Sequence, residues 1–338
     1  MSGNASKTLF HPFETGALSA PEGTRAIFLG AAPGSRPSAG FGSHLVAVQG
    51  FRPDFLALER EGVDVLPQAE GEDYDLALIL LDRHRGQNEA WLREALGRTK
   101  PGGLIVVAGT KQEGVDSFRK RVSGMVPVEH LSKHHGVVFW LSRPTDADLA
   151  DSGLMRIPEA TLVDDRFHTA PGMFSHDRID PASRLLAQTL PPAIAGRVAD
   201  FGAGWGYLSS EVLARDGGIT GLDLFEADFD SLEAARRNLA AAGSSVPQGF
   251  FWRDLLQEKV ERNYDFVVMN PPFHHGRAAE PGIGQGMIRA ASAALKPGGR
   301  LFLVANRGLP YEAALASGFA ASGEICRDER FKVLWAKR

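Results

Sequence analysis

The 338-residue sequence contains a single cysteine, Cys326. One cysteine excludes an intrachain disulfide and leaves no pair of thiolates for a zinc site, so we expect no bound metal. Long apolar runs are also missing, because the longest, residues 76–81, is far shorter than the roughly 20 residues of a membrane-spanning helix. Residues 1–12 lack the apolar stretch of a signal peptide. These absences predict a cytoplasmic protein that has no membrane partner.

An excess of positive charge is absent as well. The formal net charge is -4, so the totals do not indicate a nucleic-acid-binding protein, and any such role must depend on a local basic patch. Hydrophobic residues make up 43% and charged residues 23%, which is ordinary for a globular protein. A chain of this length is expected to form two domains.

An internal repeat supports this division. Residues 74–81 and 264–269 both begin with Tyr-Asp and are typical of buried strands. Each is followed by a helical stretch, a Lys-Pro-Gly-Gly turn and another apolar strand. Strands that alternate with helices favour a mostly parallel, doubly wound sheet. We therefore predict two α/β domains, residues 1–150 and residues 151–338.

The second half contains a glycine loop between a strand and a helix. The loop follows Asp200 and supplies Gly202, Gly204 and Gly206, which allow tight turns and close approach of a ligand. Free N–H groups at the start of the helix favour a negative group such as a carboxylate. The next strand is expected to end at Asp223, an acid that suits hydrogen bonds from a ribose diol.

This loop is not the dinucleotide fingerprint, because a bulky Tyr207 replaces the small residue which that motif requires. It resembles motif I of class I S-adenosylmethionine-dependent methyltransferases. The resemblance implies that S-adenosyl-L-methionine is the cofactor and that Asp254, which follows the third strand, approaches the adenine. Asp254 also fits the simpler role of a helix cap.

A second motif, Asn270-Pro271-Pro272-Phe273, follows the strand at 264–269. The carboxyl ends of strands are where open α/β sheets bind ligands, and two prolines leave a rigid loop that offers carbonyl oxygens. The Asn270 side-chain oxygen and the Pro271 carbonyl can each accept one N–H of a planar amino group, which directs its lone pair at a methyl group. Phe273 offers a face for a stacked base.

The order of the motifs from residue 172 onward resembles the ribosomal RNA guanine-N2 methyltransferases of the small subunit. That family has two tandem Rossmann-like methyltransferase domains, each with a doubly wound, mostly parallel seven-stranded sheet, of which the first is degenerate and the second catalytic. The resemblance implies guanine-N2 methylation, with ribosomal RNA or the small ribosomal subunit as the partner. Trp205 departs from it, since a small residue is more usual in the loop. His274 is expected to shape the base pocket rather than to bind metal.

The first half has lost the residues of both motifs. In the repeat, Phe28 stands where the second half has Asp200, and Leu80 stands where it has Asn270. We therefore expect residues 1–150 to be non-catalytic and the chain to act as a monomer. Two alternatives stay open: an adenine-N6 or protein-glutamine methyltransferase, because the tetrapeptide alone does not select the acceptor, and a non-catalytic protein that binds RNA or the ribosome.

Overall fold

The computed structural model describes residues 2–35, 43–156, 162–215, 217–272, 274–275, 278–279 and 281–338. The chain forms two compact units, Met1–Glu159 and Ala160–Arg338. Within the described residues, no helix is both long enough and apolar enough to cross a membrane.

The first unit carries its elements in this order: α1 (Ser2–Glu14), β1 (Thr24–Leu29), β2 (Ser43–Val48), α2 (Arg52–Arg60), β3 (Val65–Leu66), β4 (Tyr74–Leu80), α3 (Arg85–Arg98), β5 (Thr99–Thr110), a 3-10 turn (Lys111–Glu113), α4 (Val115–Ser123), β6 (Glu129–Lys133), β7 (Gly136–Ser142) and α5 (Asp146–Ser152).

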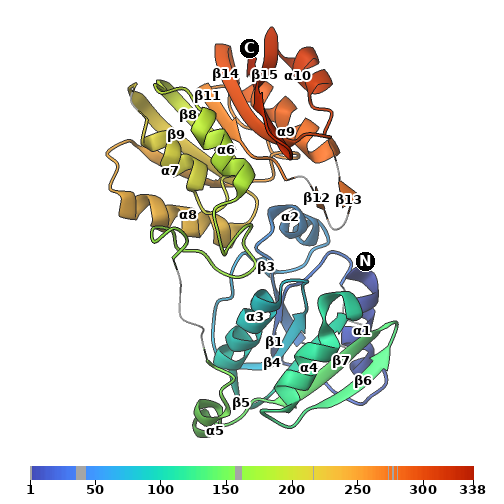
Figure 1. The fold of residues 1–338 in the computed structure, drawn as a ribbon. Coiled ribbons are helices and arrows are strands. Elements are labelled where there is room, and N and C mark those ends of the chain that lie inside the picture. Colours follow the sequence, from blue (N-terminus) through green and yellow to red (C-terminus); the bar gives the residue numbers. More distant parts are fainter. Residues whose placement is uncertain are drawn as a thin grey trace. The chain divides into compact units, whose positions relative to one another are not determined.

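The second unit follows with α6 (Pro181–Thr189), β8 (Gly196–Phe201), α7 (Tyr207–Leu213), β9 (Ile219–Glu226), α8 (Phe229–Ala242), β10 (Gln248–Trp252), β11 (Tyr264–Met269), β12 (His274–His275), β13 (Ala278–Ala279), α9 (Pro281–Ala294), β14 (Leu295–Asn306), α10 (Glu312–Gly318), β15 (Ala321–Arg327) and β16 (Phe331–Lys337) (Figure 1).

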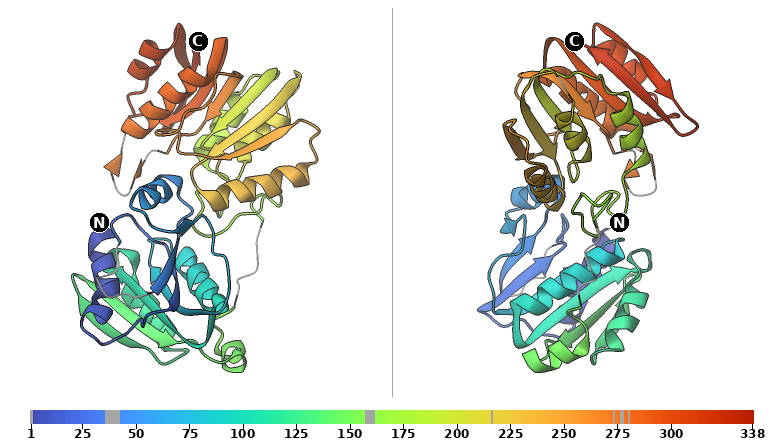
Figure 2. Two further views of the ribbon diagram at one scale, coloured as in Figure 1. Left: turned by 180° about the vertical axis from the view of Figure 1, so that it is seen from behind. Right: turned by 60° about the vertical axis from the view of Figure 1, so that its left-hand side comes forward.

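Both units have the same sheet topology, which confirms the predicted fold. The strand orders are β3-β2-β1-β4-β5-β7-β6 and β10-β9-β8-β11-β14-β16-β15, with seven strands in each sheet. Neighbouring strands are parallel except for the pairs made by β7 and by β16, which are antiparallel. A parallel sheet needs covering on both faces. In the second unit α6, α7 and α8 pack on one face and α9 and α10 on the other (Figure 2).

The repeated Tyr-Asp and Lys-Pro-Gly-Gly sequences meet in the same structure in each unit, which we call the amino-edge brace. Asp265 Oδ2 accepts the backbone N–H of Arg197 at 2.9 Å and contacts Lys296 Nζ at 2.9 Å. In the first unit Asp75 accepts the backbone N–H of residue 25 at 2.8 Å and forms an ion pair with Lys100. Each brace therefore ties together the three central strands at their amino-terminal ends.

The Lys-Pro-Gly-Gly segment lies within a strand, so our prediction of a separate turn is wrong. β5 and β14 run through it without a break, and their pairing with the preceding strand shifts register there. Gly102 and Gly298 have φ angles of 79° and 82°, the left-handed region that favours glycine. The extra residues form an irregularity that brings the lysine to its aspartate.

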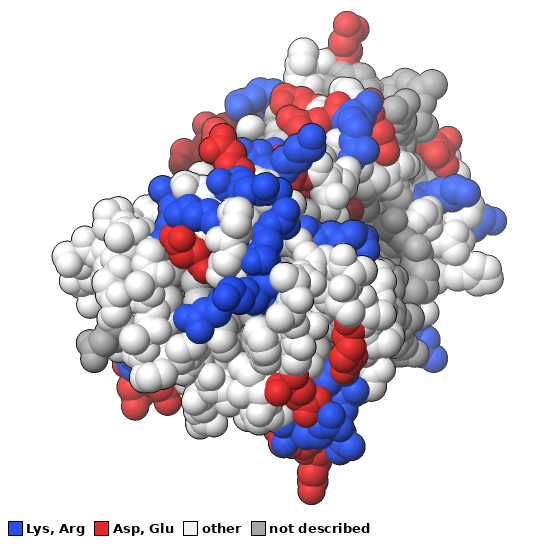
Figure 3. All heavy atoms as spheres, turned by 90° about the horizontal axis from the view of Figure 1, so that it is seen from above, with Lys and Arg blue, Asp and Glu red and all other residues white. Residues whose placement is uncertain are grey.

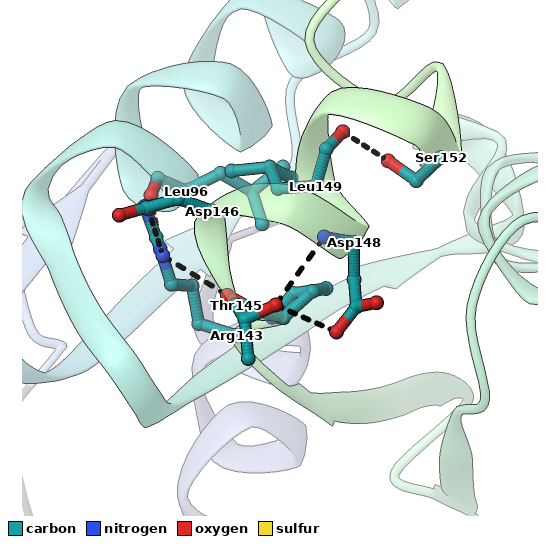
Figure 4. A network of polar contacts seen from close by, with 8 residues as sticks. Leu96, Arg143, Thr145, Asp146, Asp148, Leu149 and Ser152 are labelled. Atoms are coloured by element: carbon teal, nitrogen blue, oxygen red, sulfur yellow. Dashed lines mark hydrogen bonds and ion pairs between the residues drawn. The ribbon is translucent and has the colours of Figure 1, made fainter.

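A buried arginine closes the end of the first unit. Arg143 follows β7 and is only 8% exposed, and its Nε donates to the Leu96 carbonyl near the end of α3 at 2.9 Å. Its Nη1 contacts Asp146 at 2.7 Å, and Thr145 caps α5 by accepting the Asp148 N–H (Figure 4). These contacts fix α5 to the first unit.

Candidate active site

The predicted site residues lie at the carboxyl edge of the second sheet, where β8, β9 and β11 end side by side. Asp200 is the penultimate residue of β8 and is fully buried. The glycine loop follows it, and Gly202, Gly204 and Gly206 adopt φ angles of 75°, 53° and 91°. Side chains other than glycine rarely adopt these angles, so the sequence fixes the path of the loop.

The three glycines differ in their surroundings. A Cβ atom on Gly206 would lie 3.1 Å from the Cβ of Ala235, so this glycine permits close packing of α7 against α8. A Cβ atom on Gly204 would meet nothing within 4 Å among the described residues, its two chain neighbours aside. The space beside Gly204 therefore suits a ligand that approaches the backbone closely.

Asp223 does not end its strand, contrary to our prediction, because β9 continues to Glu226. The Asp223 carboxylate instead accepts from Arg197 Nη2 at 2.6 Å and from the Tyr264 hydroxyl at 2.7 Å. The sequence-based expectation stopped the strand at the first acid, although the apolar pattern continues through Leu224 and Phe225.

Glu226 is the acid that the structure brings to the glycine loop. Its Oε2 accepts the Gly204 N–H at 2.7 Å, and its Oε1 accepts the N–H groups of Ala227 and Asp228 at 2.8 and 2.9 Å. Our sequence analysis missed this residue. Its position directly after the last apolar residue of β9 was the signal that identifies it.

Two carboxylates at this edge have perturbed pKa values. Burial raises the pKa of Asp200 to about 7, and the negative charge of Glu226 adds to this rise, while a hydrogen bond from Ser209 opposes it. Burial also raises the pKa of Glu226 to about 7, against the effect of its three backbone donors. Asp200 Oδ1 has no hydrogen-bond partner among the described residues. Such a pair favours a ligand that brings positive charge and hydrogen-bond donors.

Asn270 follows β11, and only the nitrogen of its side-chain amide has hydrogen bonds to described residues. Its Nδ2 donates to Asp180 Oδ2 at 3.0 Å and to Ser183 Oγ at 2.8 Å. Its Oδ1 is buried and has no hydrogen-bond partner within the described part of the chain. Pro271 is buried and Pro272 is exposed. The edge thus has one oriented acceptor to which no described residue donates a hydrogen bond.

The remaining predicted residues have other surroundings. Asp254 is 4% exposed and accepts the Leu256 N–H at 2.9 Å and the Gln257 side-chain amide at 2.6 Å, so it forms a local turn after β10 rather than a helix cap. Phe273 lies outside the described residues. His274 is described only as backbone of β12.

Trp205, the residue that departs from the motif, anchors the segment before α6 to the glycine loop. Its ring lies 5.1 Å from that of Phe167, and its Nε1 donates to the Phe174 carbonyl at 2.9 Å. Asn238 of α8 donates to the carbonyls of Trp205 and His168 at 2.8 and 3.0 Å. The large side chain therefore contributes to packing on the loop.

The opposite edge of the same sheet is basic. Arg197, Lys296 and Arg300 lie at the amino-terminal ends of β8 and β14, and Lys337 pairs with Arg300 at the end of β16. In the view from above, Figure 3 shows a band of lysine and arginine side chains with aspartate and glutamate side chains beside it. Two of the basic residues named here are paired with acids, Lys296 with Asp265 and Arg197 with Asp223.

The first unit lacks these features at its carboxyl edge. Phe28 pairs with Leu78 just as Asp200 pairs with Val268, so the register confirms that a phenylalanine replaces the buried acid. Gln49 stands in the position of Glu226, because it comes one residue after Val48, which pairs with Leu29 as Phe225 pairs with Phe201. Its side-chain amide donates to the Ala31 carbonyl at 2.6 Å.

An aromatic ring occupies the corresponding space. A Cβ atom on Gly30 would lie 2.7 Å from the Trp91 ring and 2.7 Å from the Leu80 carbonyl oxygen. The equivalent Gly202 would meet the end of a methionine side chain at 3.4 Å. In the first unit, the Trp91 side chain therefore occupies the space that corresponds to the surroundings of the glycine loop in the second unit.

Comparison with known proteins agrees with this geometry. The model of the "Methyltransferase small domain" family matches residues 164–335. Ribosomal RNA small subunit methyltransferase C of Chromohalobacter salexigens is 31% identical over 266 residues, which are 77% of this chain and 77% of the relative. The chain belongs to the ribosomal RNA small subunit methyltransferase C family. The Klebsiella pneumoniae member is 31% identical over 276 residues, 80% of this chain and 77% of its own.

A solved member of the family has the same two-unit fold. The T. thermophilus 16S rRNA N2 G1207 methyltransferase (RsmC), in complex with AdoMet and guanosine, is 25% identical with a TM-score of 0.77. The match covers 99% of this chain and 91% of that one. Membership in this family makes the chain an S-adenosylmethionine-dependent methyltransferase.

Proposed function

We propose that this chain transfers a methyl group from S-adenosylmethionine to the exocyclic N2 of a guanine in 16S ribosomal RNA, and that it does so as a monomer. The observation that carries the proposal is the buried, unpartnered Oδ1 of Asn270 at the carboxyl edge of β11. A buried acceptor without a donor is costly unless a ligand supplies one. The acceptor class and the RNA come from the names of the relatives.

The residues at this edge fit the cofactor. The contact of the Glu226 carboxylate with the Gly204 N–H, and the open space beside Gly204, support a role for Glu226 in accepting hydrogen bonds from the ribose diol. The unpartnered oxygen of Asp200 suits a cationic group nearby. We assign the ribose to Glu226 and keep Asp254 as the residue beside the adenine.

The reaction requires orientation more than a strong base. S-adenosylmethionine supplies an electrophilic methyl group on a sulfonium. The Asn270 Oδ1 and the Pro271 carbonyl accept the two N–H bonds of the guanine amino group, so its lone pair is directed at that methyl carbon. The nitrogen forms the new N–C bond as the C–S bond breaks, and the bonding pair stays on sulfur. The acceptor oxygens stabilise the positive charge that develops on nitrogen, which then releases a proton to water. Phe273 and His274 complete the base pocket in this proposal.

The first unit takes no part in the chemistry under this proposal. Phe28 and Gln49 replace the two acids of the cofactor site, and Trp91 occupies the space beside Gly30. We propose that residues 1–150 contribute to RNA recognition or support the second unit.

Nucleoside analysis tests the function directly. The full-length chain is incubated with labelled S-adenosylmethionine and either 16S rRNA or assembled small subunits, and the digested RNA is analysed by mass spectrometry. We expect N2-methylguanosine, and labelling that is slower on the order of a hundredfold or more with Asn270→Ala. Label in N6-methyladenosine or in protein glutamine would establish the alternative acceptors, and no transfer to any of them would favour a binding protein.

A further inference from the structure

The amide of Asn270 is held by α6, an element outside the two motifs. Asp180 is the N-cap of α6, and its Oδ2 accepts the Ser183 N–H at 2.8 Å. The same oxygen accepts Asn270 Nδ2 at 3.0 Å, and Ser183 Oγ accepts it at 2.8 Å. Two acceptors at the start of one helix thus take both N–H bonds of the catalytic amide.

This arrangement permits one orientation of the amide. An ionised carboxylate can only accept hydrogen bonds, so the group that faces Asp180 must be the NH2 and not the oxygen of Asn270. A rotation of the amide by 180° would lose the bond to Asp180 and place two oxygens against each other. The side-chain oxygen is therefore directed away from α6, and it is the atom that remains without a partner.

The start of α6 is itself fixed to the glycine loop. The segment that leads into it is held by Trp205, whose Nε1 donates to the Phe174 carbonyl, and by the bonds of Asn238 to His168. Asp180 is thus tied to the same loop that lines the cofactor site. The residues that hold the Asn270 amide therefore follow a segment that is itself bonded to the glycine loop.

We infer that Asp180 and Ser183 are positioning residues for methyl transfer, which act by holding the Asn270 amide with its oxygen toward the substrate amine. The inference rests on the proposed function for its kinetic test. It also requires that Asp180 act only through Asn270 and leave cofactor binding unchanged.

Three substitutions at one position separate this role from helix capping. Asp180→Ser keeps an oxygen that caps α6 but is one bond shorter, so it cannot also reach Asn270. Asp180→Asn keeps a carbonyl oxygen that can accept both N–H groups. We expect Asp180→Ser to lower kcat on the order of a hundredfold, with S-adenosylmethionine affinity and Tm close to wild type, and Asp180→Asn to restore most of the rate. Ser183→Ala, which removes one acceptor, should give a smaller loss.

A double-mutant cycle shows whether Asp180 acts through Asn270. In an Asn270→Ala background, Asp180→Ser should change the remaining rate by less than about twofold, because the coupled group is already gone. An equal loss in both backgrounds would overturn the inference, as would a wild-type rate for Asp180→Ser. Asp328→Ser is the matched control, since one carboxylate oxygen of Asp328 likewise accepts two N–H groups, but both come from the backbone of the turn before β16.

A readout without substrate keeps the inference separate from the proposed function. With Asn selectively labelled with ¹⁵N, the side-chain N–H signals of Asn270 should be shifted and protected in the wild type and in Asp180→Asn, and should lose protection in Asp180→Ser. Unchanged signals in Asp180→Ser would refute the positioning role even if the RNA substrate were misassigned. Altered signals without any guanine methylation would instead count against the proposed function.

Discussion

The assignment of the ribose to Glu226 rather than Asp223 gives the sharpest prediction. Replacing Glu226 by alanine removes a carboxylate that would accept two ribose hydroxyls, and it also frees the Gly204 N–H that the carboxylate now holds at 2.7 Å. Hydrogen bonds to a charged group contribute roughly 1.5 to 3 kcal/mol each. Water replaces the side chain in part, so we expect the binding free energy of S-adenosylmethionine to weaken by about 2 to 4 kcal/mol. This corresponds to a Kd that is roughly thirtyfold to several hundredfold higher.

Asp223→Ala is the matched control because it removes an acid of the same strand. Its partners are Arg197 and the hydroxyl of buried Tyr264, which would be left without this acceptor. We expect a loss of stability of about 1 to 3 kcal/mol and a lower Tm. Affinity of the folded protein for S-adenosylmethionine should stay within about twofold of wild type.

Isothermal calorimetry with S-adenosylmethionine, together with thermal unfolding of the ligand-free variants, distinguishes the two acids. Wild-type affinity in Glu226→Ala would refute the ribose assignment. A large loss of affinity in Asp223→Ala at a temperature where the variant is folded would show that the cofactor reaches further along β9 than Glu226.

Three further predictions follow from the same edge of the sheet. Asn270→Ala should bind S-adenosylmethionine normally but lower the single-turnover rate on the order of a hundredfold or more, and a near wild-type rate would contradict the acceptor role. Burial raises the pKa of Asp200 to about 7, so the contribution of this group to the stability of the fold is present below about pH 4 and is lost as the pH rises through 7. The Tm of Asp200→Asn should therefore fall less than that of the wild type between pH 5 and 8. An equal fall in both proteins would show that Asp200 does not titrate there. Calorimetry should find one cofactor per chain, since Trp91 fills the space beside Gly30; two would show that the first unit still binds it.

Much of the fold could be predicted from the sequence because both halves repeat the same strand and turn residues. The start of β11 at Tyr264 and its end at Met269 agree with the prediction, and a helix follows the glycine loop as expected. The predicted end of the strand that contains Asp223 is too early, because the prediction places the end at this acid. In the structure, Arg197 and Tyr264 on neighbouring strands donate hydrogen bonds to the Asp223 carboxylate, so the acid lies within the sheet. Local sequence does not reveal such partners.

The candidate site was predictable in part. The glycine loop and the residues after β11 were located by short motifs, which record local geometry. The hydrogen bonds of Asn270 to Asp180 and Ser183 cross about ninety positions of the chain, and only the folded topology brings them together. The role of Gln49 in the first unit depends on strand register in the same way.

The amino-edge brace shows how one half of a duplicated chain can change its role without losing its fold. Each brace lies at the amino-terminal ends of the central strands, whereas the proposed site residues of the second unit lie at the carboxyl ends, about 20 Å away for a strand of six residues. Asp75 and Lys100 retain the same contact as Asp265 and Lys296, although Phe28 and Leu80 stand where the second unit has Asp200 and Asn270. Divergence after duplication was therefore free to act on one end of the strands while the other end kept the sheet intact. The carboxyl edge of the first unit is accordingly the surface on which a new specificity can arise at the smallest cost to stability.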